Sequence, residues 1–291
     1  MMTVLYDASG NQIQISSGSA SPLDVADYAV FTDDAGQSAR QAVLTYNGKK
    51  LYPKNYPAQR LDFVRNYGGG VMLTLGDSYT AYMNSYFTTF AGKHGLVQDN
   101  RGLASSTIAG SADGITVGYH AFWTRLDTAV AQYTAEGGYT IGGTAYTADD
   151  VKLITFMGGA NDWSTVDAEQ GIDRLGNPES EDKEQLYGAC KYIFDKLLAS
   201  FPKADIVVIL QPSNPIKGNY LMWLKEKIVR EMAEMYSLPI CDCCFEWYNP
   251  SNTEDAATYW QSDQLHLTGA GHQAIIDKLE KTVNNLPFSR T

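Results

Sequence analysis

Residues 71–80 read VMLTLGDSYT, and this stretch decides the fold. Its first five residues form a continuous apolar run, as expected for a parallel strand that is buried on both faces. Aromatic and apolar side chains then recur at helical spacing at Tyr79, Tyr82, Met83, Tyr86, Phe87 and Phe90. A buried strand that runs directly into an amphipathic helix is the repeating unit of an α/β fold. The stretch therefore predicts a strand of a central parallel sheet.

The same alternation of buried strands and amphipathic helices continues to the end of the chain. Apolar runs predict further strands at residues 153–157, 206–210 and 238–241. Apolar stripes at helical spacing predict helices at residues 186–197, 221–235 and 275–286. Elements in this order predict a mostly parallel sheet with helices on both faces.

Residues 1–66 differ from the rest of the chain in pattern and in charge. They consist of short β segments separated by turns, with Asn47-Gly48 as a hairpin turn. Their six acidic and six basic residues cancel, so the whole net charge of -11 lies in residues 67–291. We therefore expect a β-rich N-terminal appendage at 1–66, which adds no strand to the sheet of a domain at 67–291. Another protein or a second subunit is the candidate partner of this appendage.

The net charge of the chain argues against some classes of function. An acidic chain repels phosphate backbones, and no basic cluster exceeds Lys49-Lys50, so we expect no nucleic-acid partner. We also expect no membrane partner, because no apolar run approaches the length of a membrane-spanning helix. The first residues, MMTVLYDASGNQ, lack the basic and apolar regions of a signal peptide, which makes a cytoplasmic location the default expectation.

Metal and cofactor chemistry finds little support in the sequence. The cluster Cys241-Asp242-Cys243-Cys244 lacks the second ligand pair of a structural zinc site, so we expect these thiols to pack in the core. His272 could join Asp263 and His266 as a metal ligand, but its position in the last predicted helix favours a packing or surface role. We expect no metal and no cofactor.

Three short motifs place reactive side chains at the ends of predicted strands or before the last helix. Ser78 begins a helix, where the free N–H groups and the positive end of the dipole favour a nucleophile; helix capping is the alternative. Asn161, in the sequence GGAND at 158–162, could donate its amide to an oxyanion or simply form a turn. Asp263 and His266 are three residues apart, so the carboxylate can meet one imidazole nitrogen while the other acts as a general base. Solvated loop residues are the alternative for this pair.

Together these motifs form an ordered pattern that resembles the SGNH hydrolase family, also called GDSL esterases and lipases, over about residues 71–285. The resemblance implies a flavodoxin-like three-layer α/β/α fold with a mostly parallel sheet. It implies that Ser78 is the nucleophile, that His266 is the general base and that Asp263 is its partner. It also implies that the Asn161 amide and the N–H group of Ser78 form part of the oxyanion hole. The implied activity is that of a serine esterase that works through an acyl-enzyme.

One motif departs from the pattern of that family, Asn-x-Gly-x-x-Gly, in which the later Gly supplies an oxyanion-hole N–H group. The segment here runs from Asn100 through Gly102 to Ser105, so a serine stands at the later position. Only the backbone N–H group is needed, and we expect Ser105 to donate it, with Gly102 as the alternative. If the loop required a positive φ, Ser105 would strain it and reduce activity.

The expected substrate is a small-molecule or glycan ester, first of all an acetyl or other short-chain ester of a carbohydrate. The chain is acidic and rich in aromatic residues, and it lacks the apolar lid pattern expected for long-chain lipids. Asp77, Tyr79 and Trp163 are expected to line the substrate. Candidates for stacking on a sugar are Trp123, Trp163, Trp247 and Trp260.

Two other kinds of function fit the same pattern. A thioesterase or lysophospholipase could use the same triad, and a profile of acyl chain length would separate it from an acetyl esterase. A non-catalytic glycan-binding or phage-structural module could keep the fold without the activity. The intact set of Ser78, Asn161, Asp263 and His266 argues against this last alternative.

Overall fold

The computed structural model describes residues 64–112, 120–162, 174–212, 219–244 and 257–286, together with six short strands in the first 51 residues. The chain divides into two compact units, Met1–Phe63 and Val64–Thr291. This division lies three residues before the boundary that the charge distribution suggests.

The described part of the first unit consists of short antiparallel strands. They are β1 (Met2–Tyr6), β2 (Gln12–Ile13), β3 (Tyr28–Thr32), β4 (Ser38–Ala39), β5 (Leu44–Tyr46) and β6 (Lys49–Leu51). The first four form a sheet in the order β2-β1-β3-β4, and β5 pairs with β6. None of these described strands joins the sheet of the second unit, as predicted.

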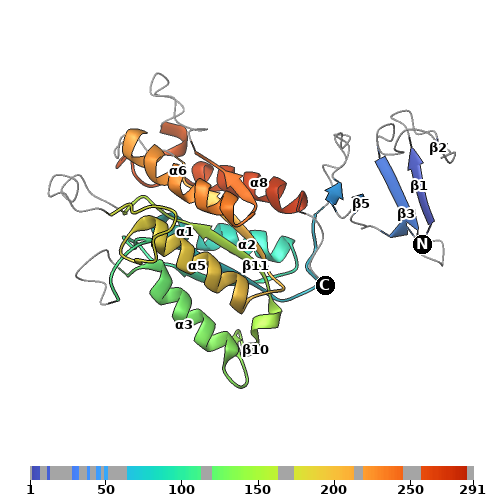
Figure 1. The fold of residues 1–291 in the computed structure, drawn as a ribbon, viewed down its shortest axis with the longest axis horizontal. Coiled ribbons are helices and arrows are strands. Elements are labelled where there is room, and N and C mark those ends of the chain that lie inside the picture. Colours follow the sequence, from blue (N-terminus) through green and yellow to red (C-terminus); the bar gives the residue numbers. More distant parts are fainter. Residues whose placement is uncertain are drawn as a thin grey trace. The chain divides into compact units, whose positions relative to one another are not determined.

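The second unit is built on a five-stranded parallel sheet (Figure 1). Its strands are β7 (Val71–Gly76), β8 (Val97–Gly102), β11 (Val151–Met157), β12 (Asp205–Leu210) and β13 (Ile240–Asp242). Every residue of β7 is buried, in agreement with the apolar run that predicts this strand. A small hairpin and a 3₁₀ turn precede β11; they are β9 (Tyr139–Ile141), β10 (Thr144–Tyr146) and η3 (Ala148–Asp150).

The strand order, β13-β12-β11-β7-β8, decides where a site can form. The chain goes from β7 outward to β8, then returns to the other side of β7 with β11 and continues to β13. The connections on the two sides of β7 therefore diverge at the carboxyl ends of β7 and β11, which is the kind of switch point where open α/β sheets bind their ligands. Ser78 follows the first of these strand ends and Asn161 follows the second.

Helices cover both faces of the sheet, so the predicted three-layer α/β/α architecture is confirmed (Figure 1). One core contains side chains of α3 (Phe122–Thr134), α5 (Leu186–Ser200) and α6 (Asn219–Met235). The other contains side chains of α1 (Ser78–Tyr82), α2 (Asn84–Lys93) and α8 (Gly269–Asn284). Alternate residues of the buried strands contribute to opposite cores, as Leu73 and Met72 do in β7.

In the part of the chain that the structure describes, no helix combines the length and the apolar character that crossing a bilayer demands.

Candidate active site

The segment that carries Ser78 is a tight passage from strand to helix. Asp77 is the N-cap of α1, and its Oδ1 accepts a hydrogen bond of 3.0 Å from the N–H group of Tyr79. Ser78 is the first residue of the helix and is 6% exposed. Since the first N–H groups of a helix have no intrahelical partners, the N–H group of Ser78 points toward the space in front of the helix.

The predicted acid–base pair forms a closed turn before α8. The Nδ1 atom of His266 lies 2.7 Å from Oδ2 of Asp263. The other carboxylate oxygen of Asp263 accepts hydrogen bonds of 3.0 Å from the backbone N–H groups of Leu265 and His266. These bonds and the ion pair lower the pKa of Asp263 to about 2, so the carboxylate stays charged and holds the imidazole by Nδ1. Of the two ring nitrogens of His266, Nε2 is therefore the one that is available for proton transfer.

Buried Tyr79 joins the helix of Ser78 to the turn of His266. Its hydroxyl donates a hydrogen bond of 2.8 Å to the carbonyl of Leu265, one residue before the histidine. Among the described residues, no hydrogen bond joins Ser78 to His266. Such contacts are often long in an enzyme without substrate. The structure therefore connects Ser78 and His266 through the buried side chain of Tyr79, without a direct hydrogen bond between them.

Two expected substrate-lining residues face the interior instead. The side chains of Asp77 and Tyr79 are buried, and each is engaged by protein partners. Neither side chain therefore reaches the surface of this structure, and their expected contact with a substrate stays a prediction. Trp123 and Trp260 are also buried, so neither offers a face to a sugar. Trp163 and Trp247 lie outside the described residues.

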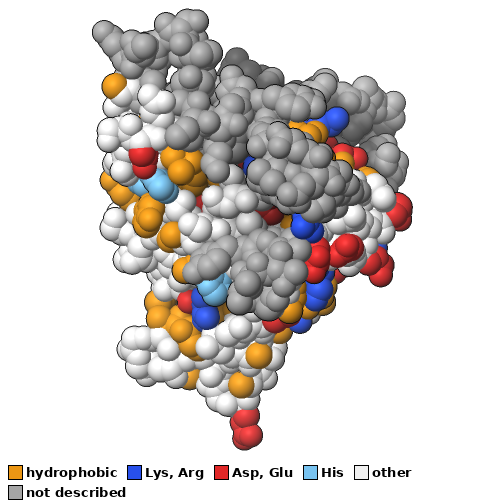
Figure 2. All heavy atoms as spheres, turned by 90° about the vertical axis from the view of Figure 1, so that its left-hand side faces the viewer, with side chains coloured by type: hydrophobic (Ala, Val, Ile, Leu, Met, Phe, Trp, Pro, Cys, Tyr) orange, Lys and Arg blue, Asp and Glu red, His pale blue; other side chains and the backbone are white. Residues whose placement is uncertain are grey.

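Tyr82 is an exposed aromatic residue beside the histidine. Its ring lies 5.1 Å from the ring of His266, with an angle of 62° between the planes, and the residue is 53% exposed. Figure 2 shows histidine side chains at the surface with hydrophobic side chains beside them. In the sequence, Tyr82 is recognised only as part of a helical stripe. Its position four residues after Ser78, on the same face of the helix, was a signal for a place in the site.

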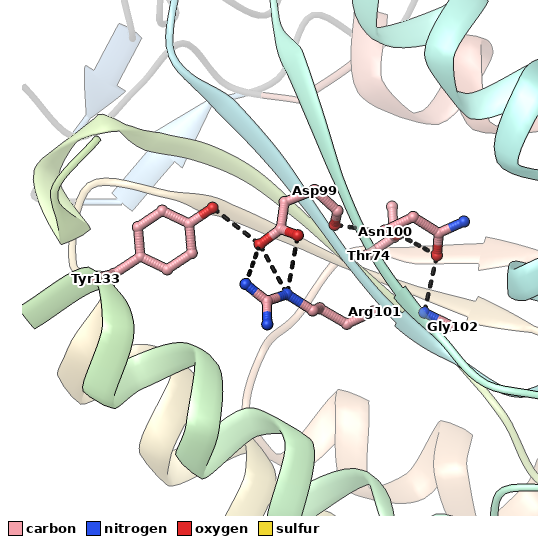
Figure 3. A network of polar contacts seen from close by, with 6 residues as sticks. All are labelled: Thr74, Asp99, Asn100, Arg101, Gly102 and Tyr133. Atoms are coloured by element: carbon pink, nitrogen blue, oxygen red, sulfur yellow. Dashed lines mark hydrogen bonds and ion pairs between the residues drawn. The ribbon is translucent and has the colours of Figure 1, made fainter. Parts of the chain in front are cut away.

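The second oxyanion motif begins in a polar network at the end of β8 (Figure 3). The side-chain oxygen of Asn100 accepts hydrogen bonds from the hydroxyl of Thr74, at 3.1 Å, and from the N–H group of Gly102, at 2.8 Å. Beside it, Asp99 accepts from Arg101 and from the hydroxyl of Tyr133. The N–H group of Gly102 is therefore already engaged. This contact counts against Gly102 as the oxyanion donor.

Ser105, the predicted donor, has a positive φ of 63°. This value lies in the left-handed region, which a glycine adopts freely and which costs other residues about 1–2 kcal/mol. A positive φ was the condition under which Ser105 was expected to strain the loop, and this condition is met. Within the described part of the chain, no hydrogen bond engages the N–H group of Ser105.

The Asn161 motif, after the end of β11, contacts the Asn100–Ser105 segment. The amide nitrogen of Asn161 donates a hydrogen bond of 3.0 Å to the carbonyl of Ser106. The buried carboxylate of Asp162 accepts from the backbone N–H groups of Ile108 and Ala109 at 2.9 and 2.8 Å. Asn161 and the residue after Ser105 are thus in direct contact.

A buried amide that no sequence motif indicates connects the Ser78 motif with the Asn161 motif. Gln211, directly after β12, donates from Nε2 to Asp77 at 2.7 Å and accepts at Oε1 from the N–H group of Ala160 at 2.8 Å. Its own N–H group donates to Glu226 at 3.1 Å. Burial raises the pKa of Asp77 to about 6 and raises the pKa of Glu226 as well. No local sequence signal marks Gln211, because its partners are far away in the chain.

The described residues contain no group of three or more His, Cys, Asp and Glu side chains that could hold a metal ion. His272 is buried and stacks on Tyr86, with the ring centres 5.4 Å apart. Cys241 and Cys243 are buried free thiols. The structure thus gives these residues places in the packing.

Fold and motifs together define a class of protein. A flavodoxin-like sheet with a serine after β7, an Asn after β11 and an Asp–His pair before the last helix is the arrangement of an SGNH-type hydrolase. The profile of the GDSL-like lipase/acylhydrolase family matches residues 74–274, and the chain belongs to this family. A comparison with curated proteins finds no match.

Several solved structures are similar to this chain over about three quarters of its length. A protein from Lactobacillus plantarum is 22% identical, with a TM-score of 0.54, over 76% of this chain and 97% of that one. A candidate GDSL-like lipase from Bacteroides uniformis is 16% identical, with a TM-score of 0.49, over 76% of this chain and 98% of its own. A variant of an acetyl xylan esterase from Geobacillus stearothermophilus is 15% identical, with a TM-score of 0.47, over 78% and 99%.

Proposed function

We propose that this protein is a serine esterase that hydrolyses acetyl or other short-chain esters of carbohydrates through an acyl-enzyme. The observation that carries the proposal is the 2.7 Å contact between Asp263 and Nδ1 of His266, linked through Tyr79 to the helix that begins at Ser78. This arrangement leaves Nε2 of His266 and the hydroxyl of Ser78 available at the carboxyl ends of the strands.

The first half of the reaction forms the acyl-enzyme. Nε2 of His266 accepts the proton of Ser78 while Oγ attacks the ester carbonyl carbon. The N–H groups of Ser78 and Ser105 and the amide of Asn161 stabilise the negative charge on the oxygen, and each donor is worth about 3 kcal/mol of barrier. The protonated His266 then gives its proton to the leaving alcohol as the carbon–oxygen bond breaks.

The second half releases the acid. His266 takes a proton from water, and the hydroxide attacks the acyl carbon that is bound to Ser78. When the tetrahedral intermediate collapses, Ser78 leaves and recovers its proton from His266. Asp263 stays ionised throughout and stabilises the imidazolium in both halves.

Tyr82 supports a ring-shaped leaving group. The leaving oxygen must approach His266 to receive its proton, and the exposed ring of Tyr82 lies 5.1 Å from that imidazole. A sugar ring at this position can pack its apolar face on the tyrosine. The preference for a short acyl chain rests on the acidic sequence and on its lack of an apolar lid pattern.

A panel of esters tests the proposal. We expect turnover of p-nitrophenyl acetate and acetylated sugars, and a loss of at least about 1000-fold in Ser78→Ala with an unchanged circular dichroism spectrum. Ser85→Ala, at an exposed serine of α2, is the matched control and should behave like the wild type. Unchanged turnover in Ser78→Ala would refute the nucleophile. Hydrolysis of the octanoate ester far faster than the acetate would refute the short-chain specificity.

The sugar is tested by two substitutions at Tyr82. Tyr82→Ala should lower kcat/KM for an acetylated sugar by about fivefold, since a ring contact is worth about 1 kcal/mol, and Tyr82→Phe should keep it. Methyl acetate has no ring to reach Tyr82, so it separates lost binding from a displaced His266. Equal losses on the two substrates would contradict a sugar contact.

A further inference from the structure

We infer that Arg125 is a positioning residue, which fixes the distance between the oxyanion-hole donors of Ser78 and Ser105. The inference rests on the proposed function, because it assigns a role within that oxyanion hole. Arg125 belongs to α3, and neither the sequence motifs nor the family pattern includes it.

The guanidinium of Arg125 bridges the two segments that carry the donors. Its Nη2 donates to the carbonyl of Gly76 at 3.0 Å and to the hydroxyl of Ser106 at 2.9 Å. Its Nη1 donates to the carbonyl of Arg101, at the end of β8. Gly76 stands two residues before Ser78, and Ser106 directly follows Ser105. One planar group therefore sets the distance between the segment of Gly76 and the segment of Ser106.

The contacts around Arg125 extend the bridge to the third donor. The carbonyl of Gly76 also accepts from the N–H group of Leu103, at 3.1 Å, and from the hydroxyl of Ser106, at 3.2 Å. The carbonyl of Ser106 accepts from the Asn161 amide at 3.0 Å. A shift of Ser106 would thus move both neighbouring donors relative to Ser78.

The guanidinium is suited to this role by shape. Its donors point in fixed directions within one plane, whereas a lysine ammonium is a single point on a flexible stem. The Arg125 group lies 4.8 Å from the centre of the Phe122 ring, and that ring is fully buried. The helix and the ring therefore hold the group in place, and a displacement of 1 Å at an active site can cost about 100-fold in rate.

The charge of Arg125 points to the same role. Within the described residues it forms no ion pair with a carboxylate, and its hydrogen bonds go to two carbonyls and one hydroxyl. Burial lowers its pKa to about 10, so the group remains charged at neutral pH. The buried carboxylate of Asp77 acts on the same charge and opposes this lowering, so the guanidinium also stabilises the segment that carries Ser78 by electrostatic attraction.

Arg125→Met and Arg125→Lys test the inference in steady-state hydrolysis of p-nitrophenyl acetate. We expect kcat to fall by about 100-fold in Arg125→Met and by about tenfold in Arg125→Lys, with KM changed less than about threefold. Inhibition by methylboronic acid, whose serine adduct carries an oxyanion, should weaken in the same order.

The matched control is Arg65→Met. Arg65 is buried and, like Arg125, donates a hydrogen bond to a backbone carbonyl, that of Leu286. Unlike Arg125, it pairs with Asp205 at the start of β12, and the amino ends of the strands lie opposite the candidate site. This variant should lose stability and keep kcat per folded molecule. If Arg125→Met fails to fold, Arg125→Lys decides. Wild-type kcat in either soluble Arg125 variant, or an equal loss in Arg65→Met, would overturn the inference; a wild type inactive on every ester would instead overturn the proposed function.

Discussion

Ser105 combines a proposed oxyanion-hole N–H group with an unfavourable backbone conformation. Its φ of 63° costs a serine about 1–2 kcal/mol, and the proposed role of its N–H group in the oxyanion hole gives a reason for this cost. The side chain has no part in that donation. Substitutions at Ser105 can therefore separate the contribution of the backbone N–H group to catalysis from that of the side chain.

We expect Ser105→Gly to keep kcat or raise it, because glycine retains the N–H group and adopts this φ without strain. The free energy of unfolding should stay equal or rise by up to about 1 kcal/mol, since the greater freedom of glycine in the unfolded chain offsets part of the gain. Urea unfolding and ester hydrolysis measure the two quantities.

Ser237 provides the control for Ser105. It has a φ of 52° and lies just after α6, away from the site motifs in sequence. Ser237→Gly should change stability by a similar amount and leave kcat unchanged. Ser105→Ala should keep kcat as well; a large loss in that variant would show that the hydroxyl takes part.

At the scale of elements, sequence patterns predict the parts of the site that depend on local structure. Apolar runs give β7, β11 and β12, and the three-residue spacing gives the Asp263–His266 turn. Both features depend on residues that are close together in the sequence, so the local sequence pattern is enough to predict them. The alternation of strands and helices also gives the three-layer fold.

The missed parts of the site depend on contacts between distant elements. Gln211 meets Asp77 across 134 positions of sequence, and Arg125 meets Gly76 across 49. The burial of Tyr79 also could not be predicted from the sequence. Helix α1 has only five residues, which is too short a stripe to show which side meets the core.

Helix α8 contains a histidine that makes stability depend on pH. His272 is buried in its first turn, and burial, together with the nearby His266, lowers its pKa from 6.5 to about 4. The folded state therefore binds fewer protons than the unfolded state between these two values. The contribution of neutral His272 is complete above about pH 6.5 and is lost as the pH falls toward 4.

We expect His272→Phe, which keeps a ring against Tyr86, to remove this dependence. From pH 7.5 to pH 5 the wild type should lose about 2 kcal/mol more unfolding free energy than the variant. Asp77, whose raised pKa acts in the opposite direction, is present in both proteins and cancels in the difference. Urea titrations at the two pH values supply the comparison, and parallel losses would rule out His272 as the source.

At the scale of the whole molecule, Arg65 shows where the second unit begins. Its backbone N–H group donates to Asn284 at 2.8 Å, and its guanidinium donates to Leu286 at 3.0 Å and pairs with Asp205 at 2.6 Å. Its carbonyl lies 2.7 Å from Nδ1 of His94. Charge counting assigns this arginine to the appendage, whereas its contacts assign it to the hydrolase unit.

Two truncated chains test this boundary. We expect residues 64–291 to fold and keep the ester hydrolysis of the full chain, because this unit holds the whole five-stranded sheet and every motif of the site. Residues 67–291 should be less stable by about 3–5 kcal/mol, because the loss of Arg65 leaves the Asp205 carboxylate without its cation and buried acceptors without donors. Thermal unfolding followed by circular dichroism, with Arg65→Met in the 64–291 chain as the control, gives the comparison. Equal stability of the two chains would move the start of the folded unit to residue 67 and leave the Arg65 contacts without energetic weight.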